Sequence, residues 1–194
     1  MVKNKYFEFA TLLMAVIVTR TFDIIGTFYY TPNLKAELNP MVRLFGFQWV
    51  GIISLQVAAI IFVACINYYS LFRTAIIPVG IKGLNFHGFL SSLYFNELTP
   101  WKWKYVVTKP LLGKNQALNM YGWLIPRILI YVGIVLMFFF TLLDFIPAYR
   151  QIHKFFVVPM YLLMFSAMPV CYYWYHKFRY EKYKCNNEQS ADNT

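Results

Sequence analysis

The sequence predicts an all-α integral membrane protein: a four-helix transmembrane bundle with interfacial helices in a long cytoplasmic segment. Hydrophobic residues make up 59% of the 194 residues and charged residues only 13%, against about 45–50% and about 25% in soluble domains. A soluble globule of this size has too little interior to bury so much apolar surface, and a disordered chain would need low hydrophobicity. Four segments also reach the length of about 20 mostly apolar residues that a membrane-spanning helix requires.

The four spans are expected at about residues 6–30, 44–68, 119–143 and 155–175. The second span carries no charge, and the third carries Arg127 near its start. The fourth contains Pro159 and Pro169, which membrane helices tolerate when neighbouring groups satisfy the freed carbonyls. We expect one transmembrane domain over residues 1–185 and a polar, disordered tail over residues 186–194.

The distribution of Lys and Arg predicts the orientation, because cytoplasmic segments are enriched in both. With the N-terminus inside, the basic residues on the cytoplasmic side are Lys3, Lys5, Arg73, Lys82, Lys102, Lys104, Lys109, Lys114, Lys177, Arg179, Lys182 and Lys184. Those on the outside are Lys35, Arg43, Arg150 and Lys154. Both termini are therefore expected in the cytoplasm. The net charge of +10 is assigned to an anionic inner leaflet and not to nucleic acid, since nucleic-acid binders carry a basic face on a polar fold.

The cytoplasmic segment between the second and third spans is too long for a structureless loop. Residues 75–95 are fairly apolar but interrupted by Pro78, Gly80 and Gly83, and Trp101-Lys102-Trp103 follows. Trp prefers the headgroup layer, and Lys reaches anionic phosphates. We therefore expect an inner-leaflet interfacial segment over residues 75–105, with a re-entrant hairpin buried in protein as the alternative.

Ionisable groups within a span are costly, so each is a functional hypothesis. Arg20, Asp23 and Thr27 are spaced by three and then four residues, which places them on one face of the first helix. A structural Arg20–Asp23 ion pair explains the two charges equally well. Arg127 in the third span lies at a depth comparable with that of Glu8, so these two could pair, or Arg127 could extend to the inner headgroups.

The outer connection between the first two spans contains Glu37 and Asn39-Pro40. Asn39 as a cap, followed by proline, suits a helix start. Glu37 is not needed for that start, and it lies at the membrane level of Asp23. Together with Arg20 and Thr27, these residues form a predicted polar cluster.

Asp144 and His153 are assigned to a second outer loop at the same level. Asp23, Glu37, Asp144 and His153 could then converge and hold a divalent metal, although no specific cofactor is predicted. Asp23, Glu37 and His153 are the candidates for acid–base catalysis. No motif of fixed spacing supports either use.

The pattern Asp23-Ile-Ile-Gly-Thr27 followed by Glu37-Leu-Asn39-Pro40 resembles an uncharacterised group of small bacterial membrane proteins. That group carries an Asp-x-x-x-Thr pattern in its first helix and Glu-x-Asn-Pro before its second. The resemblance covers about residues 20–50, and the long cytoplasmic segment departs from it. It implies a bacterial inner membrane and assigns no activity.

Three functions remain open. The first is a non-catalytic accessory, assembly or binding protein, with a membrane protein or a second copy of the chain as partner. The second is an enzyme acting on a lipid or lipid-linked substrate through the outer acidic residues. The third is a transporter or channel subunit that uses the Arg20–Asp23 pair. Fold class alone does not choose among them.

Overall fold

The computed structural model describes residues 4–34, 46–73, 83–95 and 114–191 of the chain. The helices in these ranges are α1 (Lys5–Tyr30), α3 (Trp49–Phe72), α4 (Phe86–Phe95), α6 (Lys114–Phe145) and α7 (Pro147–Ala191). All but α4 are long and apolar enough to cross a membrane. The predicted all-α bundle of four spanning helices is therefore confirmed, and the chain is an integral, multi-pass membrane protein in contact with lipid.

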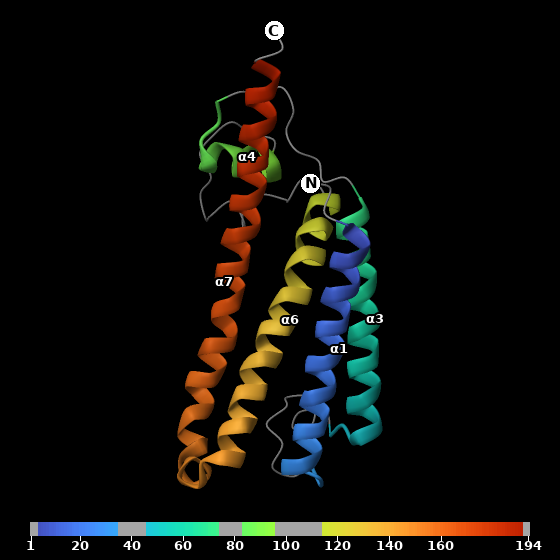
Figure 1. Cartoon of the computed structure of the whole chain (residues 1–194), viewed down its shortest axis with the longest axis vertical. Helices are drawn as coiled ribbons and strands as arrows, with labels where there is room; N and C mark the ends of the chain where they lie inside the picture. Colours follow the sequence, from blue (N-terminus) through green and yellow to red (C-terminus); the bar gives the residue numbers. More distant parts are fainter. Residues whose placement is uncertain (1–3, 35–45, 74–82, 96–113, 192–194) are drawn as a thin grey trace.

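The long helices alternate in direction along the chain (Figure 1). Both ends of the chain and α4 consequently lie at one end of the bundle, which we call the terminal end; the opposite end is the distal end. Helix α6 occupies the centre, because it packs against α1, α3 and α7, while α1 also packs against α3. Helix α7 packs against α6 and α4.

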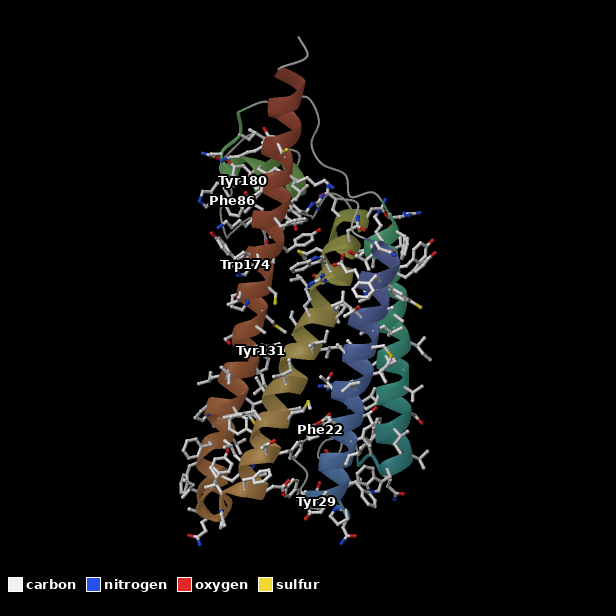
Figure 2. All side chains as sticks on the ribbon, in the orientation of Figure 1. Phe22, Tyr29, Phe86, Tyr131, Trp174 and Tyr180 are labelled. Atoms are coloured by element: carbon white, nitrogen blue, oxygen red, sulfur yellow. The ribbon has the colours of Figure 1, made fainter. Side chains whose placement is uncertain are left out.

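Close approach to α6 depends on two of its glycines. A Cβ on Gly122 would lie 2.1 Å from the carbonyl oxygen of Ile66 in α3, and one on Gly133 would lie 2.3 Å from Cβ of Thr19 in α1. Small residues allow helix backbones to come close in a membrane, where packing contributes much of the attraction between helices. Towards α7 the contact is made by side chains instead: Val135, Met160 and Met164 form a core to which Tyr131 adds (Figure 2).

Both ends of α1 are capped. The Asn4 side chain accepts hydrogen bonds from the backbone N–H groups of Tyr6 and Phe7, and the Thr31 backbone N–H donates to the Thr27 carbonyl at 2.8 Å. At the distal end, the Trp49 indole donates to the Pro32 carbonyl at 2.8 Å. This bond ties the start of α3 to the chain that leaves α1.

Helix α7 extends beyond its expected limits at both ends. The prediction of an outer loop that includes Asp144 and His153 is wrong. Helix α6 continues to Phe145 and α7 begins at Pro147, so Asp144 and His153 lie in helices. Proline suits the first position of a helix, where its missing N–H costs nothing. At the other end α7 continues to Ala191, where a disordered tail is expected from residue 186, and no glycine or further proline follows Pro169 to stop it.

Residues 83–95, which contain helix α4, are the described part of the predicted inner-leaflet segment. The six consecutive residues of α4 from Phe89 to Tyr94 are all buried. An interfacial helix in lipid alone would bury one side only. Here α4 packs against α7, with Phe89, Leu93 and Tyr94 in one core with Tyr175 and Tyr183. Protein contacts, and not lipid alone, therefore hold this helix.

Candidate functional site

The predicted Arg20–Asp23 pair forms within α1. Nη1 of Arg20 lies 3.5 Å from Oδ2 of Asp23, and the Arg20 side chain is 9% exposed. The same carboxylate oxygen also accepts from Nε2 of Gln56 at 3.4 Å, and Gln56 belongs to α3. Asp23 is thus contacted from two helices, and it links α1 to α3 in the distal half of the bundle.

The rest of the Arg20 guanidinium makes no hydrogen bond to the residues that the structure describes. Its Nε and Nη2 atoms are buried and have no hydrogen-bond partner among the described residues. A buried donor without a partner costs about 1–3 kcal/mol, and more when it is charged. Of the three guanidinium nitrogens of Arg20, Nη1 therefore contacts Asp23, while Nε and Nη2 have no partner among the described residues.

The remaining members of the predicted polar cluster are placed only in part. The Thr27 carbonyl accepts the N–H and the hydroxyl of Thr31, the latter at 2.9 Å, so Thr27 helps to end α1. Glu37 and Asn39 lie outside the described residues. Their convergence with Asp23 therefore stays a prediction.

Asp144 and His153 have separate partners. The hydroxyl of Tyr30, at the end of α1, donates to Oδ1 of Asp144 in the last turn of α6. Nδ1 of His153 lies 3.3 Å from the Tyr149 hydroxyl within α7, and burial lowers the pKa of His153 below its ordinary value. Across the ranges that the structure describes, no three His, Cys, Asp or Glu side chains are close enough together to hold a metal.

The second ion pair joins α1 to α6 towards the terminal end. Nη2 of Arg127 donates to Oε1 of Glu8 at 2.7 Å, and Nη1 donates to the Trp123 carbonyl at 2.8 Å. The guanidinium also covers the Trp123 ring, with Cζ 4.0 Å from the ring centroid. The predicted pairing of Glu8 with Arg127 is confirmed.

A buried polar cluster that sequence analysis missed lies where α4 meets α7. The Tyr94 hydroxyl lies 3.1 Å from Nε2 of His176 and 3.2 Å from the sulfur of Met120 in α6. His176 is fully buried, and its Nδ1 has no partner among the described residues. Burial raises the pKa of the Tyr94 phenol well above its ordinary value. The Tyr94 hydroxyl therefore stays protonated at physiological pH.

The same interface is closed by tyrosines around Leu84, just before α4. The Leu84 backbone N–H donates to the Tyr183 hydroxyl at 3.2 Å, and the Tyr180 hydroxyl donates to the Leu84 carbonyl at 3.1 Å. Figure 2 shows Phe86 beside Tyr180, with ring centroids 5.5 Å apart. We call α4 and residues 172–183 of α7 the α4–α7 unit.

A sequence signal for this unit existed. Tyr172, Tyr175, His176, Arg179 and Tyr183 have the spacing of one helical face. An aromatic belt at the membrane surface explains the tyrosines equally well. The spacing alone therefore does not predict that His176 contacts Tyr94 of α4.

Comparison of the chain with family models, with curated proteins and with solved structures gives no match in any of the three.

Proposed function

We propose that the chain is a non-catalytic accessory protein of a membrane, which binds a membrane-protein partner at its terminal end. The observation that carries the non-catalytic assignment is the position of Asp23. Its carboxylate is shared by Arg20 in α1 and by Gln56 in α3, as expected of a group that joins two helices. A general base instead needs its carboxylate directed at a substrate proton.

The α4–α7 unit supports the assignment of the binding face. Helix α7 has 45 residues and is thus about 67 Å long, whereas the hydrocarbon core is about 30 Å thick. The helix extends past the rest of the bundle at the terminal end (Figure 1). Helix α4 packs against α7 near that extension, so a folded unit lies at the terminal end of the bundle.

The exposed charged residues that the structure describes on this extension are Glu181, Lys182 and Lys184, so the exposed charge is basic on balance. Lys182 and Lys184 are exposed, and they follow the apolar stretch that ends near Tyr175 by about 10–14 Å along the helix. The headgroup layer is only about 5–8 Å deep on each side. The ammonium groups of these lysines can pair with acidic groups of a partner protein, and this proposal assigns them to such a partner. In this proposal the terminal end is cytoplasmic, as the positive-inside bias predicts.

The test compares two carboxylate variants for abundance, for thermal stability in detergent and for the ability to restore the phenotype of cells that lack the chain. Asp23→Asn should lower stability, because it leaves Arg20 without a counter-charge. Glu37→Gln, the other acidic residue of the sequence pattern, should leave the cellular function unchanged. A Glu37→Gln protein that is fully stable yet inactive would instead favour the alternative function, an enzyme that acts on a lipid or lipid-linked substrate.

A further inference from the structure

One edge of the Arg20 guanidinium has no partner among the described residues. Nη1 is directed at Asp23, while Nε and Nη2 are buried and have no partner in the part of the chain that the structure describes. In a guanidinium, Nε and the Nη that lies trans to Cδ donate in parallel along one edge. Nη2 is that atom, so Arg20 presents a two-donor fork inside the bundle.

The position of Arg20 decides what can reach this fork. Arg20 lies 15 residues after Lys5, about 22 Å along α1 from the terminal end. Its side chain is 9% exposed, so it neither extends to a headgroup layer nor faces lipid. The next α1 position towards the N-terminus, Thr19, touches Gly133 of α6. The fork therefore lies inside the packed bundle, in its distal half.

Two parallel donors with a delocalised positive charge match a group that carries two oxygens and a negative charge. Arginine prefers carboxylate and phosphate for this reason, while lysine offers only a point charge. We propose that the Nε/Nη2 edge of Arg20 is an oxyanion-binding site that takes a carboxylate or a phosphate. This site goes beyond the proposed accessory role, which requires no ligand at the distal half.

The oxyanion can come from a bound small anion or from a carboxylate of the chain itself, for which Glu37 is the candidate by sequence. The two sources share one chemistry and differ in one respect. A chain carboxylate would occupy the fork in the purified protein, so that added anions would find it closed. Removing that carboxylate would open the fork to them.

The experiment measures the thermal unfolding midpoint of the full chain in an uncharged maltoside detergent at constant ionic strength. Sodium acetate and sodium phosphate are titrated against sodium chloride, with acetamide as the neutral control. The backgrounds are wild type and Glu37→Gln. Each is compared with its Arg20→Lys form, which keeps the charge and loses the fork. The control is its Arg127→Lys form, at the half-buried arginine that pairs with Glu8.

Either of two results supports the site. A saturable rise of about 3 °C in wild type with acetate or phosphate, lost in Arg20→Lys and kept in Arg127→Lys, assigns the site to a bound anion. No rise in wild type, together with such a rise in Glu37→Gln that needs Arg20, assigns it to the chain carboxylate. If neither background responds in an Arg20-dependent way, the proposal is overturned.

If Arg20→Lys does not fold, Arg20→Gln combined with Asp23→Asn replaces it, since the double variant removes both charges at similar volume. A rise that persists in the double variant would overturn the proposal as well. These outcomes do not depend on the cellular phenotype, so the binding site and the accessory role fail separately.

Discussion

The Tyr94 hydroxyl lies 3.1 Å from Nε2 of His176, and both side chains are buried. This contact joins residues 82 positions apart in the sequence and fixes α4 to α7. Because the Tyr94 phenol stays protonated, its hydroxyl is able to donate to the imidazole. The contact also holds the α4–α7 unit in the position that the proposed partner would meet.

Replacing Tyr94 by Phe should weaken the α4–α7 unit. The substitution leaves Nε2 of His176 buried without its partner, which costs about 1–3 kcal/mol and lowers the unfolding midpoint by about 2–4 °C per kcal/mol. Limited proteolysis should cut faster near Gly83, which precedes α4. Tyr173→Phe is the matched control, because the Tyr173 side chain is exposed. Equal losses in the two variants would contradict the assigned role of Tyr94.

Gly122→Ala should separate α3 from α6. The added Cβ would lie 2.1 Å from the Ile66 carbonyl oxygen, and backbone cannot move aside as a side chain can. We expect a loss of about 1–3 kcal/mol, as in other overpacked interiors. In Gly51→Ala the nearest atoms belong to the Phe47 side chain at 3.2 Å, so that control should be neutral or stabilising through helix propensity. Denaturation in detergent measures both, and a destabilised Gly51→Ala with a neutral Gly122→Ala would refute the close approach.

Lowering the pH should decrease the stability of the folded chain through His153 at the distal end. Burial lowers the pKa of His153 in the folded chain, so folding favours the neutral ring. Its stabilisation is present above the unfolded-state pKa of about 6.5 and is lost as pH falls through the lower folded-state pKa. Between pH 7.5 and pH 5 the midpoint of wild type should therefore fall more than that of His153→Gln. His87→Gln, at an exposed position, should follow wild type; parallel curves for wild type and His153→Gln would exclude this contribution.

The orientation predicts which residues an impermeant thiol reagent reaches in intact cells. In a variant without Cys65, Cys171 and Cys185, a cysteine at exposed position 33 or 148 should be labelled from outside, and one at position 184 only after lysis. Positions 33 and 148 lie at the distal end and position 184 at the terminal end. Labelling of position 184 in intact cells would reverse the assigned orientation and remove the cytoplasmic partner.

Sequence reasoning found what depends on local composition. The lengths of the apolar segments predicted the four spanning helices. The similar depths of Glu8 and Arg127 in the membrane predicted their ion pair. Helical spacing paired Arg20 with Asp23. It did not find Gln56 as the third member, because an isolated polar residue in an apolar run gives no sign of which helix it faces. It also missed Tyr94 with His176, since this contact depends on α4 folding back onto a helix that begins about 50 residues later.

The extension of α7 at the terminal end is the proposed binding face, and reversing its exposed positive charges is the decisive test. Lys182→Glu with Lys184→Glu reverses two exposed charges, while Lys182→Arg with Lys184→Arg keeps them. Each variant is scored for abundance, unfolding midpoint and restoration of the phenotype of cells that lack the chain. We expect the reversed-charge protein to be stable and abundant but inactive, and the arginine variant to be active. Full activity of the stable reversed-charge protein would contradict the proposed binding face.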